Sequence, residues 1–112
     1  MGQCTARAFV FSGRPDPTWF VEEQQSQQLE VLWDQLKLSA APMHPRPSLG
    51  YRGVSMICGT SNKEYFAFDG RVNRKVGNTV EWKKDKERLF ERIVLSTAPQ
   101  GLLPAGIKDA MK

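Results

Sequence analysis

The stretch YRGVSMICGTSNKEYFAFDG, residues 51–70, decides the fold of this chain. Apolar residues alternate along its first half, which places Val54, Met56 and Cys58 on one face of a strand. The opposite face of that strand carries Tyr51, Gly53, Ser55 and Ile57. Residues 60–63 are typical turn residues, and the aromatic segment 64–68 has the composition of a further strand. We therefore predict an antiparallel hairpin with one buried face.

Upstream of this hairpin, the pattern predicts one strand and one helix. Residues 6–11 include a run of apolar side chains, which is typical of a strand that is covered on both faces or central in its sheet. Between about residues 21 and 38 an apolar stripe at helical spacing predicts a helix whose C-terminal half faces the core. The stripe consists of Leu29, Leu32, Trp33 and Leu36. Three prolines then make residues 39–50 a crossover loop.

Downstream of the hairpin, the signal for strands is weaker. A fourth strand that begins at Arg71 is interrupted at Gly77-Asn78, which favours a second short hairpin. Asp85 then stands where its carboxylate can accept hydrogen bonds from the free N–H groups two or three residues ahead, at the start of a helix. Apolar residues at helical spacing continue that helix, which we expect to end near residues 97–99.

Together these elements predict an α+β fold in the order β-α-β-β-(β)-α. The sheet is expected to be antiparallel or mixed, with three or four strands and two helices on one face. At 112 residues the chain fits one domain, 1–112, in which we expect residues 1–5 and 105–112 to be frayed. No apolar run approaches the ~20 residues of a membrane span, and no secretory signal pattern is present. We therefore expect a soluble cytoplasmic protein.

The cysteines and the single histidine give little sign of chemistry. Cys4 and Cys58 are too few for a disulfide scaffold and lack the spacing of metal ligands. Burial in an apolar strand face raises the pKa of a thiol, so we predict that Cys58 is a core residue and not a nucleophile beside His44. The N-terminus resembles a dual acylation start at Gly2 and Cys4, but Ala6 stands where that pattern requires Ser or Thr, so we expect no lipidation.

The loop Ser12-Gly13-Arg14-Pro15-Asp16-Pro17-Thr18-Trp19 follows the first strand and is the strongest candidate site. Its two prolines push Arg14 and Asp16 into extended conformations, so both charges are held with little freedom. In a functional interpretation, Arg14 binds a carboxylate or phosphate and Trp19 forms an apolar wall. In a structural interpretation, Arg14 pairs with Asp16 or a backbone carbonyl, and Trp19 closes the end of the sheet.

This loop, the segment 49–53 and the stretch 85–95 resemble small bacterial proteins of no assigned activity, which carry a Ser-Gly-Arg-Pro-Asp/Asn-Pro-x-Trp signature. The resemblance covers the chain from Ala8 to Thr97 and implies no substrate, cofactor or mechanism. It implies that residues 12–19 and 50–53 belong together, which requires the first strand and the strand after the crossover to be antiparallel neighbours. The predicted ligand-binding pocket then consists of Arg14, Asp16, Trp19, Tyr51 and Arg52.

The C-terminal half of the chain carries the excess of positive charge. Residues 71–92 hold eight basic and four acidic residues, which accounts for the whole net charge of +4. These cations, with the aromatic residues Tyr65, Phe66 and Trp82 nearby, indicate a nucleic-acid surface, whereas the interleaved acids are typical of a solvated helix face. The candidate residues for such a surface are Arg71, Arg74, Lys75, Lys83, Lys84, Lys86 and Trp82.

We predict a non-catalytic binding or adaptor module that recognises an anionic group, carried by a small ligand or a partner protein, through the Arg14/Trp19 loop. The alternative is a nucleic-acid-binding domain that uses residues 71–92, and a third class is a small enzyme of an unrecognised type. The sequence contains no metal-ligand set, no phosphate-binding loop and no nucleophile with its base. We therefore predict no catalytic residue, no metal and no cofactor.

Overall fold

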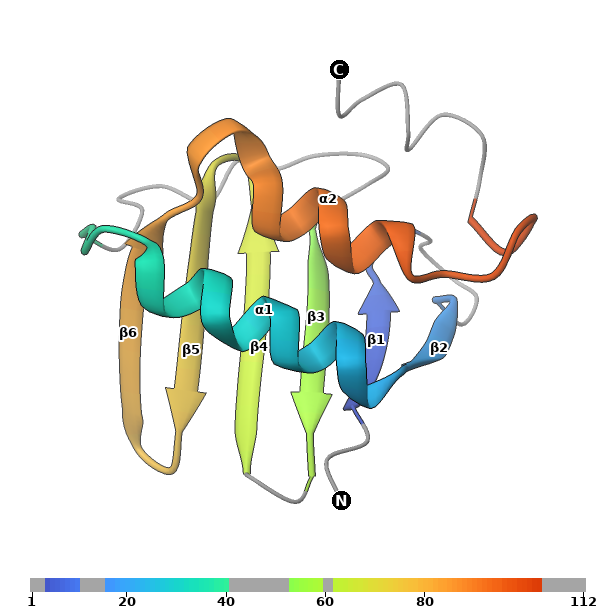
Figure 1. Ribbon diagram of the computed structural model, residues 1–112, viewed down its shortest axis with the longest axis horizontal. Coiled ribbons are helices and arrows are strands. Elements are labelled where there is room, and N and C mark those ends of the chain that lie inside the picture. The colour runs from blue at the N-terminus through green and yellow to red at the C-terminus, as the bar shows by residue number, and fades with distance from the viewer. Residues whose placement is uncertain (1–3, 11–15, 41–52, 60–61, 104–112) are drawn as a thin grey trace.

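The computed structural model describes residues 4–10, 16–40, 53–59 and 62–103 of the chain (Figure 1). The elements follow in the order β1 (Cys4–Ala8), β2 (Thr18–Val21), α1 (Glu23–Gln35), β3 (Val54–Cys58), β4 (Lys63–Phe68), β5 (Arg71–Val76), β6 (Thr79–Lys84), the 3-10 turn η1 (Lys86–Arg88) and α2 (Leu89–Ser96). None of these helices is long and apolar enough to cross a membrane.

The six strands form one antiparallel sheet in the order β2-β1-β3-β4-β5-β6. The α+β class and the β3–β4 hairpin are confirmed, but the predicted number of three or four strands is wrong. One extra strand is β2, which we had read as loop and helix start. It is only four residues long and follows Pro17, so its pairing with β1 leaves a weak local signal. The second short hairpin predicted after residue 71 is present as β5–β6, and its turn places Gly77 at φ +59°.

Both helices lie against the same face of the sheet, as Figure 1 shows. The predicted helix 21–38 forms as α1 over Glu23–Gln35, and its core-facing residues include Leu29 and Trp33, as expected from the apolar stripe. In α2, Phe90 and Val94 are buried against the sheet. The helix ends at Ser96, close to the predicted end.

Burial alternates along the strands because only one face of the sheet is covered by helices. On the helix side, Met56 of β3 and Tyr65 of β4 are at most 1% exposed. On the other side, Ile57 of the same β3 strand is 48% exposed. We call this second side the open face. It is made by the strand residues that alternate with the core residues, namely Thr5, Arg7, Thr18, Phe20, Ser55, Ile57, Glu64, Phe66, Phe68, Arg71, Asn73, Lys75, Val80, Trp82 and Lys84.

Cys4 and Cys58 form a disulfide that links β1 to β3. They stand directly opposite each other in the sheet, and each is 2% exposed. The predicted burial of Cys58 is confirmed, but the two cysteines are paired, which we did not predict. They lie 54 residues apart in sequence, and only the antiparallel register of β1 and β3 brings them together. Because β1 begins at Cys4, residues 4 and 5 are paired in the sheet although we had expected them to be frayed.

Candidate functional site

Trp19 in the predicted loop site belongs to the core. It is 5% exposed, and its indole Nε1 donates a 2.8 Å hydrogen bond to Thr97 Oγ1 just after α2. The prediction that Trp19 forms a wall of an outward-facing pocket is therefore wrong. The register of β2 on β1 places Trp19 opposite Ala6 on the helix side, so its indole closes the end of the core as in the structural interpretation.

Asp16 holds the chain between β1 and β2. Its Oδ1 accepts a 2.9 Å hydrogen bond from Val10 N, and its Oδ2 lies 3.3 Å from Arg7 Nη2. The Asp16 side chain is only 7% exposed, so little of the carboxylate is open to a ligand. Arg14, Tyr51 and Arg52 lie outside the described residues, and their part in a pocket stays a prediction.

The basic segment 71–92 does not form one surface. Directly opposite residues on neighbouring strands share a face, and Arg74 stands opposite the core residue Tyr65. Lys83 stands opposite the buried Val72, so it also faces the helices. The remaining predicted strand residues, Arg71, Lys75, Lys84 and Trp82, alternate with these two and belong to the open face. Lys86 is exposed in η1.

On the helix side, both cations pack on one aromatic ring of α1. The guanidinium carbon of Arg74 lies 5.0 Å from the centre of the Trp33 ring, and Lys83 Nζ lies 4.5 Å from it. Lys83 Nζ also donates a 2.8 Å hydrogen bond to the Trp33 carbonyl, and Arg74 lies 3.3 Å from Glu81. Burial raises the pKa of the neighbouring Tyr65. Arg74 and Lys83 therefore hold α1 on the sheet and are not available to a polyanion.

Two buried carboxylates organise the start of α2. Asp85 accepts hydrogen bonds from the N–H groups of Phe90 (2.7 Å) and Glu91 (3.0 Å), and its burial raises the pKa of its carboxyl. Asp85 thus accepts hydrogen bonds from helix N–H groups as predicted, but from residues five and six ahead instead of two or three, because η1 lies between Asp85 and α2. Arg88 donates from Nε and Nη2 to the fully buried Glu91 at 2.8 and 2.9 Å. These internal bonds indicate a structural role.

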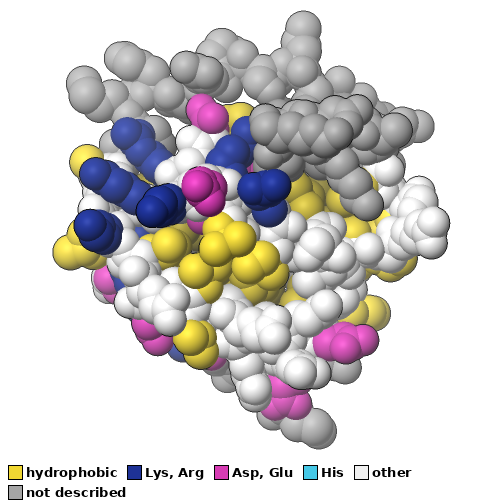
Figure 2. Space-filling model, turned by 45° about the horizontal axis from the view of Figure 1, so that its top comes forward, with side chains coloured by type: hydrophobic (Ala, Val, Ile, Leu, Met, Phe, Trp, Pro, Cys, Tyr) yellow, Lys and Arg dark blue, Asp and Glu magenta, His cyan; other side chains and the backbone are white. Residues whose placement is uncertain are grey.

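A second basic surface lies on the helix side of the molecule. Figure 2 shows Lys and Arg side chains gathered near η1 and β6, with acidic side chains among them and a hydrophobic patch below. Among the described cations of η1 and β6, Arg88 is paired with Glu91 and Lys83 is bonded to α1. These two charges are thus engaged within the protein.

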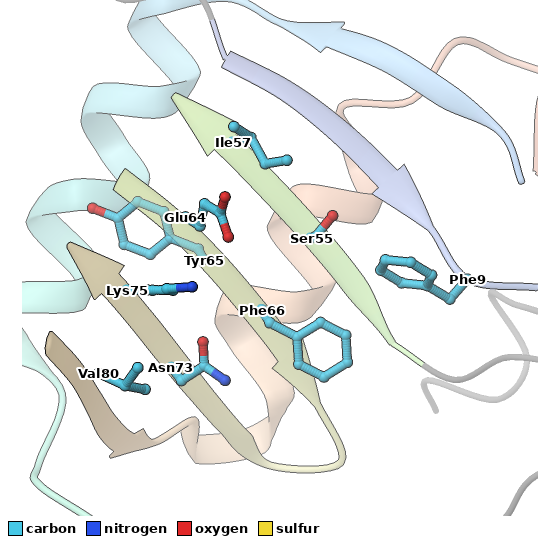
Figure 3. Close-up of a pocket in the computed structure, with 9 residues that line it drawn as sticks. All are labelled: Phe9, Ser55, Ile57, Glu64, Tyr65, Phe66, Asn73, Lys75 and Val80. Atoms are coloured by element: carbon cyan, nitrogen blue, oxygen red, sulfur yellow. The ribbon is translucent and has the colours of Figure 1, made fainter. Parts of the chain in front are cut away.

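The open face contains a concavity of about 330 Å³ (Figure 3), lined by Phe9, Ser55, Ile57, Glu64, Tyr65, Phe66, Asn73, Lys75 and Val80. Phe9 and Phe66 form one wall, with ring centres 5.9 Å apart. The Tyr65 ring packs on the helix side against Trp33, so Tyr65 lines the concavity with other atoms. A Cβ at Gly53, which has φ +117°, would stand 2.6 Å from Phe66 Cζ. Glycine at this position therefore allows Phe66 to lie where it does.

A row of side chains runs across the strands through this concavity. The directly opposite pairs are Ser55 with Phe66, Phe66 with Asn73 and Asn73 with Trp82. Phe66 and Trp82 are thus two strands apart, or about 10 Å at the usual strand spacing. The Asn73 amide lies between them. The row presents two aromatic side chains separated by a group that both donates and accepts hydrogen bonds.

Three cations flank this row. Arg71 and Lys84 stand directly opposite each other on β5 and β6, on one side of it. Lys75 lies on the other side, opposite Glu64. Among the described residues, no carboxylate forms an ion pair with Arg71, Lys75 or Lys84. The open face thus combines aromatic, amide and unpaired cationic groups.

Sequence reasoning identified four residues of this surface, namely Arg71, Lys75, Lys84 and Trp82. It named Phe66 only as an aromatic near the basic segment, and it missed Phe9 and Asn73. The alternation of the β3 strand did place Ser55 and Ile57 on the face opposite the core, and the same rule extended to β4 would have assigned Phe66 to that face. Residues 4–10, 16–40, 53–59 and 62–103 contain no group of three His, Cys, Asp or Glu that could hold a metal ion.

No protein family, curated protein or solved structure matches the chain. The resemblance to the bacterial proteins with the Arg-Pro signature stays a prediction. The open face therefore has to be interpreted from its own chemistry.

Proposed function

We propose that this protein is a non-catalytic binding module that recognises an anionic ligand on the open face of its sheet. The observation that carries this proposal is the concavity at Phe9 and Phe66, whose lining residue Asn73 lies two residues along β5 from Arg71. Neither Arg71 nor the opposite Lys84 forms an ion pair with a carboxylate of the described residues. Binding sites for small ligands are concave and mostly apolar, with a few polar groups that fix orientation. The open face has this composition.

The pairing of Arg71 with Lys84 supports an anionic ligand. Like charges directly opposite on neighbouring strands destabilise a sheet. The same two strands place Arg74 opposite Glu81 in the complementary arrangement, at 3.3 Å. A bound phosphate or carboxylate would relieve the repulsion between Arg71 and Lys84. The ligand-free protein therefore carries an electrostatic repulsion that an anionic ligand would remove.

The loop site expected from the sequence is replaced as the centre of this proposal. Asp16 and Trp19 are engaged in bonds within the protein. Arg14, Tyr51 and Arg52 stay predicted contacts for an anionic group or a partner protein. The third class, a small enzyme, gains no support from Cys58, because its sulfur is bonded to Cys4.

The proposal is tested by titrating the protein with adenosine monophosphate and, separately, with pyrophosphate, while amide chemical shifts are recorded. We expect both probes to shift amides of β5 and β6, and the ring-bearing probe to shift those around Phe66 as well. Lys84→Ala should weaken both probes, whereas Arg92→Ala, which removes an exposed charge from α2, should not. Shifts confined to α2, or equal effects of the two variants, would refute the proposal.

The same variants give a second readout. Because Lys84 repels Arg71, Lys84→Ala should leave the free energy of unfolding unchanged or raise it by up to about 0.5 kcal/mol. A residue whose removal weakens binding without weakening the fold is retained for binding. A clear loss of stability in Lys84→Ala would instead indicate a structural role.

The disulfide bears on location. Disulfides persist in oxidising compartments and are rare in the cytosol. The Cys4–Cys58 bond is therefore at odds with the cytoplasmic location expected from the sequence, and we propose an oxidising compartment in its place.

A further inference from the structure

We infer that the ligand of the open face is single-stranded nucleic acid, with unpaired bases stacked on Phe66 and Trp82. This inference rests on the proposed function and names the ligand class for the same site. It follows from the order of aromatic, amide and cationic groups across β4, β5 and β6.

The aromatic groups supply two stacking positions. Phe66 is half-buried, with its ring beside that of Phe9 at 5.9 Å, so the ring is held in place before a base arrives. Trp82 is half-buried in the same row, two strands and about 10 Å away. Stacking on aromatic side chains is the main source of base affinity in proteins that bind single strands. Asn73, between the two rings, can hydrogen-bond the edge of a base.

The cations fit a phosphate backbone that runs alongside the stacked bases. Arg71 and Lys84 form a pair on one side of the row, two residues along β5 and β6 from Asn73 and Trp82. In this arrangement a chain that crosses the strands places its bases on the row and its phosphates over that pair. Lys75 stands on the opposite side, within the concavity, where it can reach a phosphate or a base edge.

The size of the concavity favours a single strand over a duplex. Its volume of about 330 Å³ lies at the lower end of the range for ligand pockets, enough for one small ring system. A base can enter it only if its faces and edge are exposed, and in a duplex they are stacked and paired. The remaining affinity has to come from groups outside the concavity, which are Trp82 and the Arg71–Lys84 pair.

The experiment measures the binding of fluorescently labelled dT8 and rU8 by anisotropy between 50 and 200 mM salt. If Arg71, Lys75 and Lys84 neutralise three phosphates, the slope of log affinity against log salt is about −2, which is roughly a twenty-fold loss over this range. Lys84→Ala should reduce that slope by about 0.7, whereas Arg92→Ala should leave it unchanged.

The stacking positions are tested with a matched pair of aromatic variants. Phe66→Leu and Trp82→Leu should each weaken dT8 by about five-fold or more. Phe20→Leu, at a side chain that is 76% exposed on the edge strand β2, should have no effect. Circular dichroism of each variant shows whether it is folded. If Phe66→Leu does not fold, Trp82→Leu still tests the stacking.

Further probes separate the two proposals. Recognition of single strands would be refuted if an octamer without bases bound as tightly as dT8. It would also be refuted if adenosine monophosphate bound as tightly as the octamers. In both cases the proposed anion site would still be supported. Stronger binding of a blunt duplex than of either octamer would refute it as well. If neither octamer, adenosine monophosphate nor pyrophosphate binds, both proposals are wrong.

Discussion

Reducing the Cys4–Cys58 disulfide should cost this protein about 4 kcal/mol of folding free energy. The bond closes a loop of 54 residues, and the chain-entropy model gives about 14 cal/mol/K for a loop of that length, or ~4 kcal/mol at 25 °C. A domain of this size is stable by roughly 6–17 kcal/mol. The bond therefore supplies a large share of the total, and its loss should lower Tm by roughly 15–20 °C.

The disulfide is best removed by reduction and not by substitution, because reduction keeps both sulfur atoms in the core. Cys4 and Cys58 are each 2% exposed, so the bond should be reduced in denaturant and the protein refolded with reductant present. Urea unfolding of the oxidised and reduced proteins gives the difference in free energy. The double variant Cys4→Ala, Cys58→Ala has no crosslink and serves as the control for any effect of the reductant.

Two results would refute this reasoning. Equal stability of the oxidised and reduced proteins, within about 1 kcal/mol, would show that the crosslink does not constrain the unfolded chain as assumed. If the reductant changed the unfolding free energy of the double variant by a comparable amount, the effect would be due to the reductant and not to the crosslink. A thiol titration of the unreduced, denatured protein provides the starting point, and it should find no free thiol.

Three further variants test the packing around the site. Trp19→Phe removes the indole donor to Thr97 and should cost about 1–3 kcal/mol in urea unfolding; a variant as stable as the parent would contradict the core role of this indole. Gly53→Ala forces a Cβ to within 2.6 Å of the Phe66 ring at φ +117°, so it should cost about 2 kcal/mol and also weaken dT8; an intact affinity would argue against the concavity as the site. Asp85→Asn tests whether ionisation of Asp85 lowers the stability of the folded protein. Because burial raises the pKa of Asp85 above 3.8 in the folded state, the folded protein holds this proton more tightly than the unfolded chain, and stability falls as the pH rises from that value through the folded pKa. The variant lacks this loss, so its stability relative to the parent should improve as the pH rises above 3.8, and a difference that stays constant with pH would be the contrary result.

Local pattern was enough to predict much of this fold. Alternation in β3 placed Met56 in the core, and helical spacing placed Leu29 and Trp33 on the buried side of α1. The capping role of Asp85 also followed from its position before an apolar helix. These features depend on periodicity and on side-chain chemistry within a few residues, which a single sequence displays directly.

The candidate site could be predicted only in part. Arg71 and Lys84 were candidates, but so were Arg74 and Lys83, and nothing in the charge pattern separates the two pairs. Two-residue alternation puts the pairs on opposite faces once β5 and β6 are known to be strands. Which of those faces is covered depends on where α1 and α2 pack.

The sequence by itself determined which residues are apolar at the period of a strand or a helix, and therefore most of the core. Tertiary structure alone decided that Thr18–Val21 pairs with β1, that Cys4 meets Cys58, and that one set of cations is left exposed beside Phe66 and Trp82. The physical reason is that strand pairing and helix docking join residues far apart in the chain. Their register follows from the packing of the whole sheet and its two helices, and no short stretch of sequence contains it.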